Sequence, residues 1–416
     1  MTARHAMPMV VCLLEVIALA STAPTAERTF TVAVSAGACD RLCEPVTVEV
    51  PVAGFPVRAD LTENGGFHFR VQAWQRPGER TARVTWLVSG LGAGQTRTWR
   101  LTLFGDHPEA PGEGGVRVSP LGEGQLAVEV AGRPFTVYHF GSDLPRPYCF
   151  PVLGVRGERV TRAYPMEKDV PGETTDHVHH RSFWVAFGIV NGVNLWAEEP
   201  GSGRTVHRAF EAIESGPVFG RIRSLNDWVG PDGRRLMEDV RELRVYDVGP
   251  FLRMLDFEIT FRATDGPVTL GDTKEGLFAF RVASTMDVKP DGTGGKIENS
   301  AGGVNESQTW GQRAAWCDYS GPVAGGLSGI AIMDHPANLR HPTWWFVRNY
   351  GLLACNPFGE SAYTGNAQAD GTYTIPAGQE LTLRYRVVIH EGNATVGNIK
   401  ALWESYATPP EVSVKR

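Results

Sequence analysis

Long apolar runs and basic runs are both missing from most of this 416-residue chain. After the first two dozen residues, no segment approaches the roughly 18 to 20 apolar residues that a membrane-spanning helix needs. The 40 Lys and Arg residues are outnumbered by 46 Asp and Glu, which gives a net charge of -6. No stretch forms the positive stripe by which proteins follow a phosphate backbone. The sequence therefore predicts neither a membrane-spanning body nor a nucleic acid partner.

Cysteines and common catalytic signatures are also scarce. Loss of an N-terminal signal would leave five cysteines, whose number and spacing fit neither a disulfide framework nor a zinc site: Cys39, Cys43, Cys149, Cys317 and Cys355. Cys39 and Cys43 are close enough for one local disulfide, and the sequence leaves their pairing open. The chain has no G-x-S-x-G elbow, P-loop, dinucleotide fingerprint or H-E-x-x-H motif.

The first residues have the composition of an export signal. Arg4 and His5 precede an apolar run from Met9 to Ala20, which Glu15 interrupts, and small residues follow. This order predicts a signal peptide over residues 1–26 and an exported protein, periplasmic or extracellular. The alternative is a misassigned start ahead of a cytoplasmic protein.

Two β-rich domains are predicted from the length and the strand pattern. Over residues 27–106, short segments such as Val46–Val52 and Ala82–Leu87 alternate apolar and polar residues, as expected of a small antiparallel β-sandwich. The stretch 105–115 is rich in Gly and Pro and cannot continue a strand, so the boundary is placed there.

A large antiparallel β-sandwich is predicted over residues 116–408. Strand-like runs such as Val218–Trp228 and Phe251–Phe261 follow one another without helical crossovers. One short terminal helix is expected over Asn393–Ala407, where apolar residues recur at near-helical spacing before Pro409. The predicted fold class is therefore all-β.

The densest polar cluster is the segment Thr175–Ser182, which contains His177, His179 and His180. If the segment is extended, His177 and His179 point to one side and His180 to the other. Imidazole transfers protons near neutral pH and binds several transition metals. We expect these three histidines to be catalytic, whereas the structural alternative is that they only bind neighbouring loops.

Carboxylates in two further segments are candidates to assist the histidines. Asn191-Gly192 is a strong hairpin signal that would bring Trp196 and Glu198 beside the histidine segment. The glycine-bounded turn Gly271–Gly276 contains Asp272, Lys274 and Glu275, which could form an acid–base pair, a metal ligand or a salt-bridged turn.

A second histidine-rich loop, Asp334–Trp345, holds His335 and His341, each followed by a proline that stiffens the backbone. Ordered loops of this kind present recognition groups. Trp rings and Arg or Asn side chains together suit the apolar faces and hydroxyls of a sugar or uronic acid. The predicted substrate-binding residues are Arg181, Trp184, Trp196, Lys274, Arg281, Trp316, Asp318, Asn338, Arg340, His341, Arg348 and Asn356.

Seven short motifs resemble one bacterial family, labelled "methane oxygenase PmoA-like": Arg146–Tyr148, Thr161–Pro165, Asp176–Ser182, Val190–Gly192, Gly271–Gly276, Trp316–Gly321 and Asp334–Asn338. The match covers most of residues 116–359, and it departs at Val178, where relatives are expected to have Pro. The label names an integral membrane subunit, so it does not describe this chain. The resemblance implies an exported, carbohydrate-active β-sandwich similar to the galactose-mutarotase superfamily, with His and carboxylate side chains along a shallow groove.

Three functions remain open from the sequence. The first is an exported enzyme acting on a glycan or sugar derivative by His and carboxylate acid–base chemistry, as hydrolase, lyase or epimerase, without a cofactor. The second is a non-catalytic carbohydrate-binding protein. The third is a metalloenzyme in which His177 and His179 bind a divalent metal ion together with His335 or His341. All three assume that the two histidine-rich loops meet in space.

Overall fold

The computed structural model describes residues 28–52, 58–63, 66–75, 79–104 and 114–416. The predicted signal peptide and most of the predicted domain boundary lie outside the described residues. Strands dominate, the sheets are antiparallel, and the all-β prediction is confirmed.

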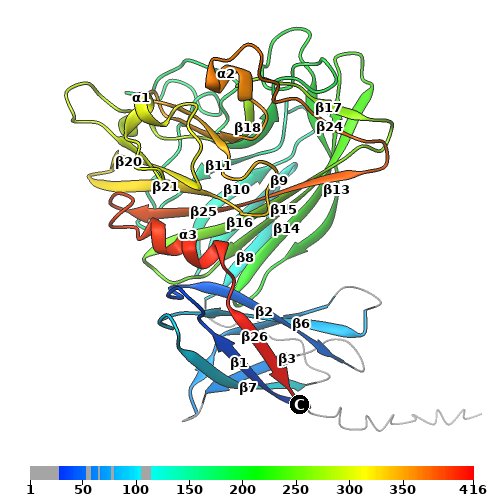
Figure 1. Cartoon of the computed structure of the whole chain (residues 1–416), viewed down its shortest axis with the longest axis vertical. Helices are drawn as coiled ribbons and strands as arrows, with labels where there is room; N and C mark the ends of the chain where they lie inside the picture. Colours follow the sequence, from blue (N-terminus) through cyan, green and yellow to red (C-terminus); the bar gives the residue numbers. More distant parts are fainter. Residues whose placement is uncertain (1–27, 53–57, 64–65, 76–78, 105–113) are drawn as a thin grey trace, which may run out of the picture.

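The N-terminal part forms two sheets at the bottom of Figure 1. The five-stranded sheet contains, in spatial order, β26 (Glu411–Lys415), β1 (Arg28–Ser35), β7 (Thr96–Phe104), β3 (Arg58–Glu63) and β4 (His68–Phe69). The three-stranded sheet contains β2 (Glu44–Pro51), β6 (Thr81–Val88) and β5 (Val71–Trp74). Alternation builds the core between them, because every second residue of β1, such as Val32 and Val34, is buried.

Two eight-stranded sheets form the larger part of the molecule. Sheet A contains β22 (Trp344–Arg348), β23 (Leu352–Asn356), β18 (Gly276–Arg281), β12 (Phe183–Phe187), β11 (Tyr148–Val152), β10 (Arg133–His139), β9 (Gln125–Val130) and β8 (Val116–Gly122). Sheet B contains β13 (Arg204–Glu214), β14 (Phe219–Val229), β15 (Arg235–Tyr246), β16 (Leu252–Arg262), β25 (Glu380–Glu391), β21 (Gly326–Asp334), β20 (Trp316–Val323) and β19 (Lys296–Asn299). A two-stranded ribbon joins β17 (Val268–Leu270) to β24 (Tyr373–Ile375). The main hydrophobic core draws on residues of both sheets, so the two sheets pack face to face.

The C-terminus returns to the N-terminal part, which the predicted domain end at residue 408 did not foresee. Strand β26 pairs antiparallel with β1, and Figure 1 shows it in red beside the blue strands. Buried Arg386 on β25 bridges Glu44 at 2.8 Å and Asp256 at 2.7 Å. Fully buried Arg41 donates to the backbone oxygen of Ser405 at 2.9 Å. Buried polar contacts therefore connect the N-terminal part with the larger part of the molecule.

Helices are few and short. The predicted terminal helix exists but begins later, as α3 (Ile399–Ala407), because Asn398 has a left-handed backbone and residues 393–398 form turns. Two further helices, α1 (Asn305–Thr309) and α2 (Glu360–Thr364), and the 3-10 turn η1 (Ser284–Met286) were not expected, since five residues are too few to show a helical period. In the described residues, no helix has the length and apolarity to cross a membrane.

Candidate functional site

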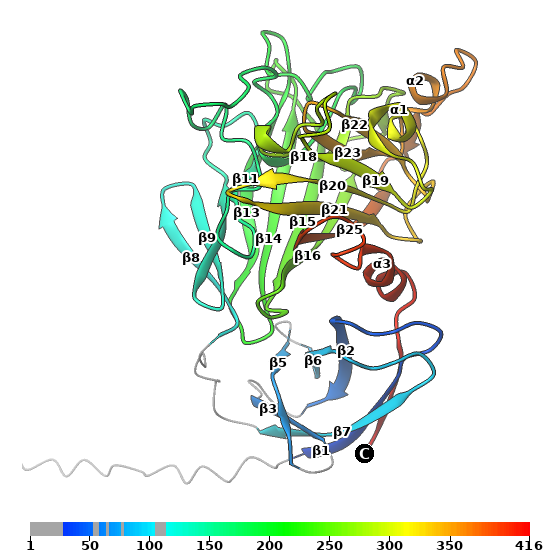
Figure 2. The same cartoon turned by 90° about the vertical axis from the view of Figure 1, so that its left-hand side faces the viewer.

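The first histidine-rich segment lies on the outer face of sheet A. Along β12, Phe183, Val185 and Phe187 join the core between the sheets. The alternate residues Trp184 and Ala186 belong to a second apolar cluster on the other face. Figure 2 shows loops above the labelled strands β11, β18 and β22 of sheet A. In the chain, the segment with His177, His179 and His180 leads directly into β12.

The segment turns instead of running extended, so the predicted alternation of its side chains is wrong. His177 has a positive φ of 46°, and the N–H of His180 donates to the His177 oxygen at 3.0 Å. A left-handed backbone costs a non-glycine residue roughly 1–2 kcal/mol, so surrounding contacts must hold it. The turn brings all three imidazoles together, with ring centroids 4.6 to 5.8 Å apart.

Stacking fixes two of these rings. Tyr350, His177, His180 and Trp184 form a column in which successive centroids are 4.9, 4.7 and 5.2 Å apart and successive planes differ by 16°, 10° and 24°. Tyr350 follows β22 and Trp184 belongs to β12, so distant parts of the chain set the ring planes. The column leaves the outer ring pair, Tyr350 and His177, partly open to solvent.

Asp176 connects the histidines to two buried arginines. Its Oδ1 accepts hydrogen bonds from Arg281 at 2.7 Å and from Arg162, and its Oδ2 lies 3.0 Å from His177 Nδ1. Burial alone would raise the pKa of Asp176, but Arg281, with His177 and Arg162, lowers it overall. The ionised carboxylate therefore accepts a hydrogen bond from Nδ1–H of His177.

His180 is locked in the opposite tautomer. Arg281 Nη1 donates to its Nδ1 at 3.0 Å, so the remaining ring proton of the neutral imidazole is on Nε2. The ring is 1% exposed, and burial together with the nearby Arg281 lowers its pKa well below the usual range. His180 is thus a neutral hydrogen-bond donor and not a proton acceptor.

His179 is half-buried beside Trp196, whose ring centroid is 6.0 Å away. Burial lowers the pKa of His179 to about 4, with Arg146 and His177 adding to the effect and Glu198 opposing it. His179 is therefore neutral at pH 7.

Glu198 lies near the imidazoles as predicted but is already paired. Asn191 and Gly192 form the predicted turn, with φ of 49° and 82°. Both oxygens of Glu198 then accept hydrogen bonds from Arg181, at 2.7 and 2.6 Å, and Arg146 lies at 3.6 Å. This geometry favours a structural ion pair over an acid or base.

Asp272, Lys274 and Glu275 lie at the other end of β12. Phe187 pairs with Gly276 there, and the four residue steps of β12 put about 13 Å between this end and the histidines. Asp272 Oδ2 accepts from the N–H groups of Ser361 and Gly371, and Lys274 lies 3.7 Å from Glu275. Nearby Asn356 donates to the Thr273 oxygen. These residues stabilise loops in the structure and do not reach the imidazoles.

The two histidine-rich loops do not converge, so that assumption is wrong. His341 precedes β22 and Tyr350 follows it, which places the two loops at opposite ends of the strand. His341 Nδ1 lies 2.6 Å from Asp334, and His335 packs on Tyr406 of α3. Asn338 donates to the backbone oxygen of Arg384 on β25, and Arg340 donates to that of Pro357. The alternative metal set of His177, His179 and His335 is therefore not assembled, and the described residues contain no other group of three suitable ligands.

Most of the predicted sugar platforms are buried. Trp184 is 1% and Trp196 is 2% exposed, and they pack beneath the histidines. Asp318 is fully buried against His390 at 2.8 Å, and Arg348 is paired with Glu306 at 2.6 Å. Trp316 borders a separate pocket beside α3. The residues predicted to bind one sugar are therefore buried or lie at separate places in the sandwich, although they looked alike in the sequence.

Three residues of the cluster were not among the predicted site residues: Arg146, Arg162 and Asp287. Burial raises the pKa of Asp287 to about 6, although the nearby Arg281 lowers it in part. A Cβ at Gly351 would lie 2.8 Å from Asp287 Oδ1 and 3.3 Å from Arg281 Nε, so the two groups flank the same glycine. Arg146 and Arg162 occur in motifs that were recognised, but only the fold shows that they are buried beside the histidines.

Comparison with protein families identifies the family of this chain's larger part. The model of a family of unknown function, DUF6807, matches residues 125–404, which include the whole histidine segment. No curated protein matches the chain.

Proposed function

We propose that this chain, which belongs to the DUF6807 family of unknown function, is an exported enzyme that acts on a sugar derivative by proton transfer through His177. One observation carries the proposal: Asp176 binds Nδ1 of His177, and the His177 side chain is 37% exposed.

The Asp176–His177 pair has the geometry of a general base held by a carboxylate. With its proton on Nδ1, neutral His177 has a free lone pair on Nε2, and no hydrogen bond to that atom forms among the described residues. A proton taken up at Nε2 creates an imidazolium next to the Asp176 carboxylate, which stabilises it. Arg162 and Arg281 keep that carboxylate ionised and in place.

The neighbouring histidines serve as neutral polar groups. His180 carries its proton on Nε2, and Arg281 fixes that tautomer. His179, with its lowered pKa, is a neutral imidazole that can donate or accept one hydrogen bond to a substrate. Three imidazoles with different tasks fit a site that orients a polyhydroxylated substrate.

The charge pairing favours epimerisation or elimination over hydrolysis. Glycoside hydrolysis usually needs a protonated carboxyl group as well as a carboxylate. Of the three carboxyl groups in the cluster, Asp176 accepts from two arginines and Glu198 accepts twice from Arg181. The third, Asp287, has a raised pKa but makes no hydrogen bond to an imidazole among the described residues. Asp176 and Glu198 are already held by arginines, which disfavours either as the acid of a hydrolysis, whereas the first step of an epimerisation or elimination passes a proton from carbon to Nε2 of His177.

The sugar class and the export rest on the sequence. The motifs that resemble the PmoA-like family, with its implied similarity to galactose mutarotases, support a carbohydrate substrate, and the apolar run before Ala20 supports export. A non-catalytic carbohydrate-binding protein is the second candidate, because stacked rings such as His177 on Tyr350 also suit a sugar face. No cofactor is part of the proposal.

The test is a turnover screen of the purified mature chain on neutral oligosaccharides and uronides. His177→Gln should lower any turnover found by about 10²- to 10⁴-fold. The matched control is His341→Gln, since His341 has the same Nδ1 pairing to an aspartate but lies at the far end of β22. Equal losses in both variants, or full activity in His177→Gln, would contradict the proposal.

A further inference from the structure

We infer that the groove between α3 and the edge strand β19 is a binding site for one neutral pyranose unit of a glycan, with Trp316 as its apolar floor. The groove is separate from the histidine site, because β19 is the edge of sheet B whereas the histidines cover sheet A. The inference does not depend on the proposed catalysis.

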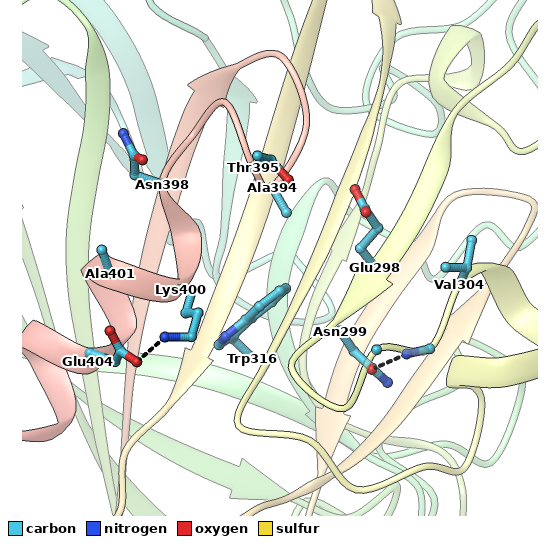
Figure 3. Close-up of a pocket in the computed structure, with 12 residues that line it drawn as sticks. Glu298, Asn299, Val304, Trp316, Ala394, Thr395, Asn398, Lys400, Ala401 and Glu404 are labelled. Carbon is cyan, nitrogen blue, oxygen red and sulfur yellow. Dashed lines mark hydrogen bonds and ion pairs between the residues drawn. The ribbon is translucent and has the colours of Figure 1, made fainter.

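The groove has the size of a small-molecule site. Its volume is about 430 Å³, within the range of roughly 300–1,000 Å³ found for such sites. Figure 3 shows Trp316 between Lys400 of α3 and strand β19, which carries Glu298 and Asn299, with Thr395 on the α3 side. Elements far apart in sequence therefore form its walls.

Trp316 differs from the tryptophans beneath the histidines. Trp184 and Trp196 pack against other rings, whereas Trp316 makes no ring stacking or cation–π contact with any described residue. It retains 9% exposure at the groove wall. An indole face without an aromatic neighbour can pack against the CH face of a sugar ring.

Two buried polar atoms in the wall lack partners in the described part of the chain. Glu298 binds Lys296 through Oε1 at 2.7 Å, but its Oε2 has no hydrogen bond. Asn299 is 4% exposed and accepts through Oδ1, yet its Nδ2 has no acceptor. Buried polar groups are rarely left unpaired, and this unfilled acceptor and donor together match hydroxyl groups.

The start of α3 adds two more donors. No side chain caps this helix, and the N–H groups of Lys400 and Ala401 bond to no residue in the described ranges. Both residues line the groove.

The charges around the groove cancel in pairs. Lys400 is paired with Glu404, and Lys296 with Glu298. Among the described residues that line the groove, every charged side chain has a partner, so the ligand that fits is neutral and rich in hydroxyl groups.

The test is titration calorimetry of the full mature chain with three neutral probes: cellohexaose, xylohexaose and mannohexaose. At least one should bind at millimolar concentration, and Trp316→Ala should weaken that binding about tenfold. Because this variant removes a mostly buried ring, Glu298→Gln serves as a second variant that retains the fold and should weaken binding severalfold. Trp403→Ala is the matched control. Trp403 lies on α3, which borders the groove, but Trp403 itself does not line it.

Two further outcomes separate this site from the proposed catalytic one. His177→Gln should bind the probe as the wild type does, whatever its turnover. Binding lost in His177→Gln but retained in Trp316→Ala would overturn the inference, and so would the absence of binding to all three probes.

Discussion

Asp287 provides a prediction whose size follows from the structure. Burial raises its pKa to about 6 from an ordinary 3.8, while Arg281 opposes the shift and Asp176 adds to it. Below pH 3.8 both folded and unfolded chains carry the proton, so no stability is lost. Between pH 3.8 and 6 the unfolded state ionises first and stability falls as pH rises, and above pH 6 the penalty is constant. A pKa difference of about 2 corresponds to about 3 kcal/mol, which partial solvent access reduces to about 1–2 kcal/mol.

Asp287→Asn removes this penalty, because an amide does not ionise. We expect the variant to be more stable than the wild type by about 1–2 kcal/mol at pH 7.5 and by close to zero at pH 4. Urea unfolding of both proteins at the two pH values, followed by Trp fluorescence, measures the difference. The same advantage at both pH values, or none at pH 7.5, would refute the assigned burial of this carboxyl group.

Two further predictions concern buried ion pairs. Arg386→Ala leaves Glu44 and Asp256 without their partner and should lower the free energy of unfolding by about 3–5 kcal/mol, measured by thermal unfolding. The control is Arg384→Ala on the same strand. It removes the ion pair with Glu258, in which the side chains are 43% and 38% exposed, and should lower the free energy of unfolding by less than about 1 kcal/mol. Similar losses in the two variants would contradict the role given to Arg386 between the N-terminal part and sheet B. Glu198→Gln deprives Arg181 and nearly buried Arg146 of their carboxylate and should lower stability by about 2–4 kcal/mol, while Glu199→Gln should change it by less than about 0.5 kcal/mol. An unchanged melting temperature in Glu198→Gln would mean that the Arg181 pair forms only weakly in solution.

Local patterns in the sequence predicted the fold well. The alternation in β2 and the turn at Asn191-Gly192 both depend on neighbours in the chain, so they can be read without the tertiary structure. Strand β26 could not be predicted, because its five residues are all exposed and show no buried face. Its place is set by pairing with β1 at the other end of the chain.

The histidine cluster was found by composition, but its geometry was not. Its partners come from far away in sequence: Arg281 meets His180 across 101 residues, and Tyr350 stacks on His177 from the turn after β22. The composition of the second histidine-rich loop also indicated a functional site. In the structure, however, His341 is paired with Asp334 and His335 packs against α3. A residue type at a suitable spacing indicates chemistry, whereas burial and long-range partners decide where that chemistry is free to act.

The tautomer of His177 tests the central claim most directly. Nitrogen NMR of the protein labelled at histidine, at pH 8 and with His177 assigned by the His177→Gln variant, reports which ring nitrogen carries the proton. The account predicts the proton on Nδ1 of His177, bound to Asp176, with Nε2 unprotonated, and the reverse tautomer for His180. A proton on Nε2 of His177 would contradict the account, because the nitrogen proposed to accept the substrate proton would already be occupied.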